Sequence, residues 1–145
     1  MIAVFVDTNV VLYAVDASES EKRPVASSWV ESLWRTRAGH VSVQVLHEFY
    51  VNATRLEEGL EPTEARAAVD ALASWNPLQN DPSLFTSAWD IEDRFGFSFW
   101  DALIVAAAQL AGCNYLLTED LQDGQVIDRL TVVNPFLHAP ESILT

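Results

Sequence analysis

The sequence contains very little cysteine, since Cys113 is the one cysteine among its 145 residues. A lone thiol cannot form an internal disulfide bond, which excludes the disulfide-stapled scaffolds of small secreted proteins. We therefore expect a reducing compartment, namely the cytoplasm, and we expect the Cys113 thiol to lie in the hydrophobic core.

Long apolar runs are absent as well. The apolar stretch at residues 1–6 ends at Asp7 and has no basic leader before it. A membrane-spanning helix needs about 20 apolar residues, and a secretory signal needs a basic start followed by a longer apolar segment. Both are excluded for this stretch. We predict that it forms a buried first strand and that the chain does not associate with a membrane.

Basic residues are scarce. Eight Lys and Arg stand against 21 Asp and Glu, which gives a formal net charge of −13. Phosphate backbones are normally attracted to basic surfaces, so composition alone argues against a nucleic-acid partner. Bound divalent cations offset part of a carboxylate cluster, and an acidic protein can pair with a basic protein. The charge therefore weakens a nuclease interpretation without excluding it.

Apolar residues are plentiful, at 50% of the chain. This content is enough for a core, and about 100–150 residues is a common size for one compact domain. We predict a single domain over residues 1–145, with no internal repeat and no linker.

The periodicity of the apolar residues alternates between strands and helices. It predicts strands over residues 2–6, 41–43, 114–117 and 130–133. It predicts helices over residues 24–37, 44–56, 62–73, 81 or 83 to 95, and 98–111, the last with Ser98 as its cap and Gly112 as its stop. This alternation predicts an α/β fold with a central, mostly parallel β-sheet flanked by α-helices.

Acidic residues stand where the predicted strands end. Asp7 follows the first strand and Asp120 follows the strand at residues 114–117. Glu48 lies about one turn into the helix after residues 41–43, and Asp101 lies in the first turn of the helix at residues 98–111. Ligands of open α/β sheets bind beyond the carboxyl ends of the strands. We therefore expect these four acids to converge on one cleft.

Clustered carboxylates repel one another and raise one another's pKa. A bound Mg²⁺ or Mn²⁺ ion removes this repulsion, and both ions prefer oxygen ligands. Such a site can hydrolyse a phosphodiester, since one ion activates a water and a second can stabilise the leaving oxygen. We assign Asp7 and Asp101 to the principal ion. Glu48 and Asp120 complete its shell, hold a second ion or orient the water.

Four motifs carry a family resemblance. They are Val6-Asp7-Thr8-Asn9, His47-Glu48-Phe49, Phe99-Trp100-Asp101-Ala102-Leu103-Ile104 and Leu116-Leu117-Thr118-Glu119-Asp120. In order and spacing they resemble the PIN-domain family, and within it the VapC-type toxins of bacterial toxin–antitoxin pairs.

The resemblance implies an endonuclease that cleaves single-stranded RNA with Mg²⁺ or Mn²⁺, is inhibited by a cognate antitoxin and forms a homodimer. It carries the family's acidic residues over to Asp7, Glu48, Asp101 and Asp120. Glu119 and Asp123 share the loop of Asp120 and remain alternatives for the fourth acid. Asn9 and Thr118 are small polar neighbours that can hydrogen-bond the substrate, a water or the scissile phosphate.

Each acid also has a purely structural interpretation. Asp7 can cap a short helix that starts near Val10, and Asp101 stands at capping-box spacing from Ser98. Glu48 can be an exposed helical carboxylate, and Asp120 can shape a turn. Only the ordered set of four favours a catalytic site.

Aromatic residues precede Asp101 at Phe95, Phe97, Phe99 and Trp100. Exposed aromatic rings can stack on the bases of a single strand. We expect most of these rings to pack in the core, with one of them lining the cleft.

Two other function classes fit part of the pattern. A phosphoryl-accepting receiver or an aspartate-based phosphohydrolase would also place Asp7 after the first strand, but such proteins usually need a lysine late in the chain, and Lys22 is the sole lysine. A catalytically weak binding module that acts through a protein partner would keep the fold and the acids. A metal-titrated RNA-cleavage assay separates this module from an enzyme.

Overall fold

The computed structural model describes residues 1–144, which build a five-stranded sheet covered by helices. The strands are β1 (Val4–Val6), β2 (Gly39–His40), β3 (Tyr115–Leu117), β4 (Val126–Ile127) and β5 (Leu130–Val133). Their order is β2-β1-β3-β5-β4, and all neighbours are parallel except β4, which pairs antiparallel with β5 at one edge. The predicted α/β fold with a mostly parallel sheet is therefore confirmed.

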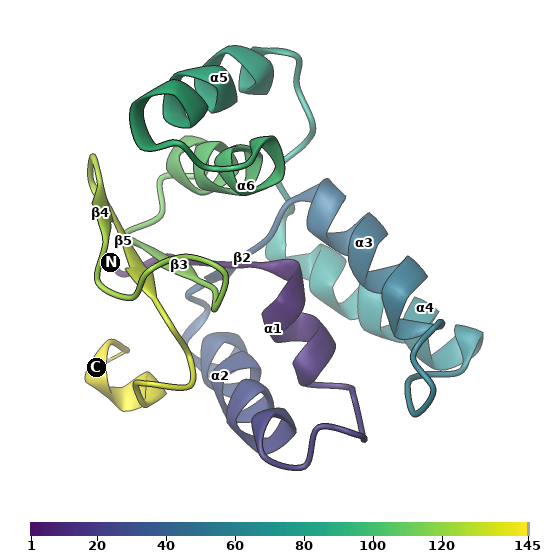
Figure 1. The fold of residues 1–145 in the computed structure, drawn as a ribbon. Coiled ribbons are helices and arrows are strands. Elements are labelled where there is room, and N and C mark those ends of the chain that lie inside the picture. Colours follow the sequence, from purple (N-terminus) through teal and green to yellow (C-terminus); the bar gives the residue numbers. More distant parts are fainter. Residues whose placement is uncertain (145) are drawn as a thin grey trace.

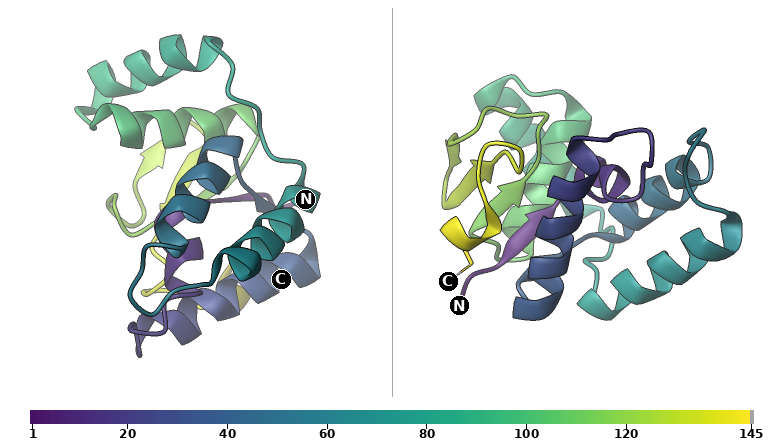
Figure 2. Two further views of the ribbon diagram at one scale, coloured as in Figure 1. Left: turned by 90° about the vertical axis from the view of Figure 1, so that its right-hand side faces the viewer. Right: turned by 90° about the horizontal axis from the view of Figure 1, so that it is seen from below.

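The helices lie on both sides of the sheet. They are α1 (Thr8–Tyr13), α2 (Lys22–Thr36), α3 (Val43–Ala53), α4 (Pro62–Leu72), α5 (Ser83–Phe95) and α6 (Phe99–Leu110). Helices α5 and α6 pack together on one side, and α1 and α2 lie on the other, while α3 and α4 form a third pair beside the sheet (Figures 1 and 2). None of the helices within residues 1–144 has the length and apolar character of a membrane span.

Burial explains the apolar segments. All three residues of β1 are buried, as expected for a strand covered on both faces. Helix α6 buries half of its 12 residues, and it ends before Gly112, whose positive φ of 73° suits glycine. Cys113 lies in the core as predicted, and burial raises the pKa of its thiol to about 12.

Several predicted boundaries were wrong. Residues 41–43 do not form a strand. Strand β2 lies earlier, at Gly39–His40, and Ser42 makes only an isolated bridge with Leu78. The Ser42 hydroxyl instead accepts a hydrogen bond from the Val45 N–H and caps α3, which ends at Ala53 rather than at residue 56. The short edge strand β4 was not predicted.

The topology places two loops side by side at the carboxyl edge of the sheet. Strands β1 and β3 are neighbours, with Val6 paired with Leu117, and the chain leaves them toward opposite edges. Such a switch point is where open α/β sheets form ligand sites. The segments that begin at Asp7 and at Thr118 are therefore adjacent.

Candidate active site

Asp7 is a buried carboxylate whose two oxygens are both held by this pair of loops. It is the N-cap of α1, and its Oδ1 accepts a hydrogen bond of 2.7 Å from the Thr8 N–H. Its Oδ2 accepts a hydrogen bond of 2.8 Å from the Thr118 hydroxyl. The structural interpretation of Asp7 as a helix cap is thus confirmed, with the helix starting at Thr8 rather than near Val10. The cap also fixes the carboxylate at the switch point.

Burial raises the pKa of Asp7 to about 6. The hydrogen bonds from Thr118 and Thr8 oppose the rise, whereas the negative charges of Asp120 and Asp101 add to it. These three carboxylates, which come from separate parts of the chain, are therefore close enough to influence one another's ionisation.

Asp101 stands in the first turn of α6, where its backbone N–H donates to the Ser98 hydroxyl at 3.2 Å. Its side chain is half-buried. Burial raises the pKa of Asp101, and the neighbouring Asp120 charge raises it further. Ser98 fixes the start of the helix, and the helix start in turn brings Asp101 to the acidic cluster.

Glu119, one of the alternatives for the fourth acid, forms a hydrogen bond and an ion pair with residues outside the group of candidate acids. The Tyr13 hydroxyl donates to it, and Lys22 Nζ lies 3.0 Å from its Oε2. The Lys22 ammonium also lies over the rings of Tyr13 and Phe136, 4.7 and 5.2 Å from their centroids. Lys22 of α2 neutralises the Glu119 charge, and Tyr13 of α1 holds the side chain by a hydrogen bond.

Asp123 is occupied as well. Its Oδ1 accepts from the Asn134 N–H at 2.8 Å, and its Oδ2 lies 2.8 Å from His138 Nε2. Both contacts hold the pKa of Asp123 below its usual range. Asp120, by contrast, is exposed, and its backbone N–H donates to the Thr118 hydroxyl oxygen at 3.1 Å. Of the three acids in this loop, Asp120 is the one that acts electrostatically on Asp7 and Asp101.

Glu48 joins the site through a residue that sequence reasoning missed. The Thr8 hydroxyl donates to its Oε2 at 3.0 Å, and Gln44 Nε2 donates to its Oε1 at 2.9 Å. Thr8 thus connects Glu48 to Asp7, its neighbour in sequence. The spacing of Gln44 and Glu48, four residues apart on one helix, was a signal that could have identified the second contact.

Asn9 and Thr118 are hydrogen-bonded to each other beside Asp7. Asn9 Nδ2 donates to the Thr118 hydroxyl oxygen at 3.3 Å, and Thr118 is fully buried. The Oδ1 of Asn9 is buried and has no hydrogen-bond partner among the described residues. A buried acceptor without a donor is costly, so this oxygen suits a ligand or a water molecule.

The sequence of residues 4–126 matches the family model described as PIN domain. The chain belongs to the PIN-domain family. The resemblance of the four motifs to the PIN-domain family is thereby confirmed.

Solved structures share the fold of this PIN domain. A toxin–antitoxin complex from Klebsiella pneumoniae contains a chain with a TM-score of 0.66 and 23% identity, covering 92% of this chain and 97% of that one. A DNA-bound VapBC from Salmonella typhimurium gives a TM-score of 0.61 and 19% identity, covering 91% and 97%. The sarcin–ricin loop cleaving toxin VapC20 of Mycobacterium tuberculosis gives 0.57 and 20%, covering 79% and 87%. No curated protein matches this PIN domain in sequence.

The chemistry of the acidic cluster fits a hard divalent cation. None of the ion pairs among residues 1–144 involves Asp7, Glu48, Asp101 or Asp120, so these carboxylates lack a protein cation. Carboxylate and amide oxygens are the ligands that Mg²⁺ and Mn²⁺ prefer. In the described part of the chain no three acidic, His or Cys side chains are already grouped as a metal site.

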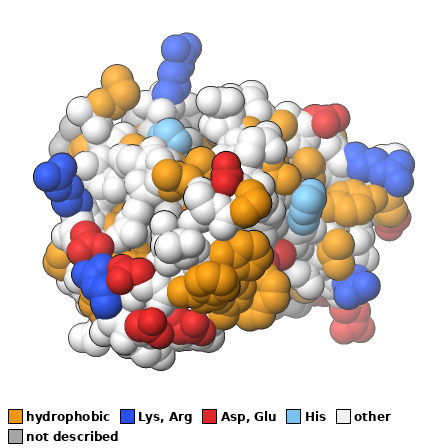
Figure 3. All heavy atoms as spheres, turned by 90° about the horizontal axis from the view of Figure 1, so that it is seen from above, with side chains coloured by type: hydrophobic (Ala, Val, Ile, Leu, Met, Phe, Trp, Pro, Cys, Tyr) orange, Lys and Arg blue, Asp and Glu red, His pale blue; other side chains and the backbone are white. Residues whose placement is uncertain are grey.

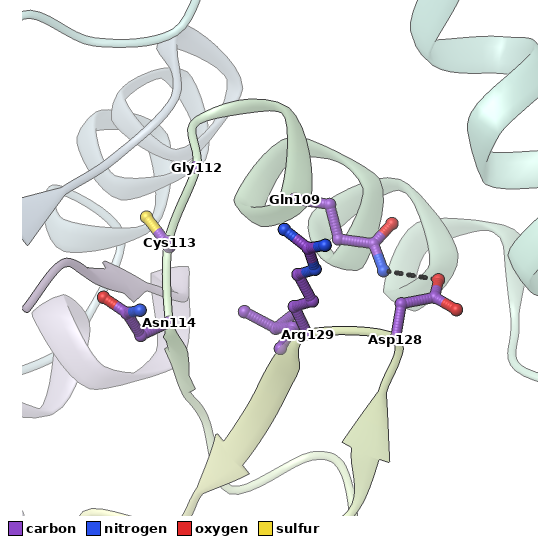
Figure 4. A pocket seen from close by; sticks show the side chains of 7 residues that line it. Gln109, Gly112, Cys113, Asn114, Asp128 and Arg129 are labelled. Carbon is purple, nitrogen blue, oxygen red and sulfur yellow. Dashed lines mark hydrogen bonds between the residues drawn. The ribbon is translucent and has the colours of Figure 1, made fainter.

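A pocket of this PIN domain lies at the opposite end of the sheet from the candidate acids (Figure 4). It is lined in part by Gly112 and Asn114, which precede β3, and by Asp128 of the β4–β5 turn. Asp128 pairs with Arg94 at 2.8 Å and accepts from Gln109. This pocket contains none of the candidate acids.

Proposed function

We propose that this PIN domain is a metal-dependent endoribonuclease that hydrolyses single-stranded regions of RNA. One observation carries the proposal. Asp7, Asp101 and Asp120 approach one another at the carboxyl edge of the sheet without a protein cation, and the burial of Asp7 makes its charge costly. A cleft that keeps such a cluster favours a ligand that supplies positive charge.

In this proposal the chain's own residues hold the cation and the scissile group. Asp7 and Asp101 would bind Mg²⁺ or Mn²⁺, and Asp120 and Glu48 would complete the shell or orient the attacking water. A bound divalent cation neutralises the carboxylates and lowers the pKa of water, which is the chemistry that phosphodiester hydrolysis requires. Thr118 and Thr8 keep Asp7 and Glu48 oriented. Asn9 Oδ1 is available to accept a hydrogen bond from the substrate or a water.

We also propose that the chain is the toxin of a toxin–antitoxin pair, that it works in the cytoplasm as a homodimer, and that a cognate antitoxin inhibits it. Support comes from the similar structures, two of which are a toxin–antitoxin complex and a VapBC. A third is described as a toxin that cleaves the sarcin–ricin loop.

The purified chain is expected to cut a single-stranded RNA in the presence of Mg²⁺ or Mn²⁺ and to stop when EDTA is added, because the carboxylates alone repel the phosphate. Expression without an antitoxin is expected to arrest growth. If the chain binds RNA or a protein partner but does not cleave RNA at any concentration of either metal, the result would reject the enzyme hypothesis in favour of the binding module.

Asp120→Asn is expected to lower the cleavage rate at least about tenfold, because the Asp120 charge acts on both Asp7 and Asp101. Asp123→Asn is the matched control, since it removes the same charge from a residue held by Asn134 and His138. Single-turnover cleavage of one RNA by both variants is the measurement. A larger loss in Asp123→Asn than in Asp120→Asn would show that the fourth acid has been misassigned.

A further inference from the structure

Four aromatic side chains form an exposed patch on α5 and at the start of α6. This aromatic patch consists of Phe85, Trp89, Phe99 and Trp100, and the exposed fractions of Phe85, Trp89 and Trp100 are 47%, 53% and 65%. Seen from the side of α5 and α6, hydrophobic side chains gather in one area with acidic side chains along its edge (Figure 3). Single exposed apolar residues are ordinary, whereas a contiguous aromatic group indicates a binding surface.

The rings of the aromatic patch are held in place by one another. Phe85 and Phe99 are stacked, with centroids 5.9 Å apart and planes 14° apart. Trp89 lies 5.9 Å from Phe85, and Trp100 lies edge-on to Phe99 at 6.1 Å. Because the rings already support one another, a planar ligand that stacks on them needs little further ordering of side chains.

A groove of about 300 Å³ is lined by Phe85, Phe99 and Trp100 of the aromatic patch, and two of its lining residues connect it to the candidate acids. Trp100 lines it and is followed directly by Asp101. Gln44 lines it as well and donates to Glu48 at 2.9 Å. A strand whose phosphate lies at the carboxylates therefore has its neighbouring bases within reach of the groove.

The charge around the groove determines which part of a strand it can bind. Asp81 is the one charged residue that lines it, and the Ser83 N–H bonds the carboxylate at 2.9 Å and holds its pKa below the usual range. With a net charge of −13, the chain offers phosphates little attraction outside a bound cation. Nucleobases are uncharged, with apolar faces for the rings and polar edges for Gln44 and Asn80.

We propose that nucleobases next to the scissile phosphate stack on the aromatic patch, so that bases rather than phosphates hold the RNA. This inference rests on the proposed ribonuclease function, because it assigns the way in which the same site holds its substrate. It also gives an acidic chain a means of binding RNA without a basic surface.

Binding of a fluorescently labelled single-stranded RNA of roughly ten nucleotides, measured by anisotropy in EDTA, tests the proposal without requiring cleavage. Trp100→Ala and Trp89→Ala are each expected to weaken binding about tenfold, since base stacking on one aromatic side chain has an effect of that order. Trp100→Phe should keep most of the affinity. Leu110→Ala, an equally exposed apolar residue at the far end of α6, should leave it unchanged.

Two further comparisons separate bases from phosphates. A strand of equal length with abasic sites should bind wild type as weakly as intact RNA binds Trp100→Ala. The affinity for intact RNA should also depend only weakly on salt concentration, with a slope that corresponds to fewer than about two neutralised phosphates. Equal binding of abasic and intact strands, or a steep dependence on salt, would overturn the proposal.

The outcomes also distinguish this proposal from the function on which it rests. If RNA binding depends on bases but no cleavage occurs at any metal concentration, the proposed stacking on the aromatic patch would stand and the proposed nuclease function would be rejected. Normal cleavage by both tryptophan variants with unchanged RNA affinity would retain the nuclease and reject the surface. If Trp89→Ala converts a dimer to a monomer and leaves RNA affinity unchanged, the result would show that the aromatic patch is an interface between protein subunits and not an RNA-binding surface.

Discussion

Replacing Asp101 with Asn is expected to lower the rate of RNA cleavage by roughly 100-fold or more without lowering stability. Even groups that only support metal ligands typically contribute about 10- to 100-fold, so loss of a direct ligand should reach or exceed that range. Stability should persist because the Asp101 N–H, which bonds the Ser98 hydroxyl, is retained in the variant. Burial and the nearby Asp120 charge also make the native carboxylate costly.

The matched control is Asp70→Asn, which removes one negative charge from an exposed position on α4. Cleavage rates and thermal midpoints of the two variants, measured side by side, separate a role in the site from a change in net charge. Wild-type cleavage by Asp101→Asn would remove Asp101 from the metal shell. An equal loss in Asp70→Asn would attribute the effect to net charge.

Replacing Asp7 with Asn is expected to stabilise the metal-free protein at pH 7.5 by about 2 kcal/mol while abolishing cleavage. The folded pKa of Asp7, about 6, lies above its ordinary value of 3.8. A raised carboxyl pKa means that the folded state binds more protons than the unfolded state between these values. The contribution of Asp7 to the stability of wild type is therefore most favourable below about pH 4 and declines as the pH rises to about 6, where the carboxylate ionises.

Urea unfolding of wild type and Asp7→Asn in EDTA, at pH 4 and pH 7.5, measures this effect. The stabilisation by Asn should be present at pH 7.5 and nearly absent at pH 4, where the native carboxyl is protonated. Added Mn²⁺ should stabilise wild type more than Asp7→Asn. A variant that is equally destabilised at both pH values would show that the hydrogen bonds to Thr8 and Thr118 matter more than the buried charge.

Much of the fold was predictable because apolar periodicity and helix caps are local signals. The Ser98 cap and the Gly112 stop gave the bounds of α6 closely, and the apolar run before Asp7 gave β1. The strand predicted at residues 41–43 was wrong because Ser42 caps a helix in an otherwise β-branched stretch. Strands as short as β2 and β4 owe their position to pairing with β1 and β5, which local sequence does not encode.

The candidate site was predictable to the level of residue types and strand ends. The positions of Asp7 and Asp120 followed from the rule that parallel strands share a carboxyl edge. The contacts that distinguish Asp120 from Glu119 and Asp123 did not follow from this rule, because they involve Lys22, Tyr13 and His138, which lie far away in sequence. The connection from Thr8 to Glu48 likewise depends on the packing of α1 against α3.

Manganese-soaked crystals test the central claim most directly, because anomalous scattering locates the ion independently of activity. An anomalous peak is expected within ligand distance of the Asp7 and Asp101 carboxylates, near Asp120. A peak confined to Asp123 and His138, or no peak beside Asp7 at saturating Mn²⁺, would contradict this claim.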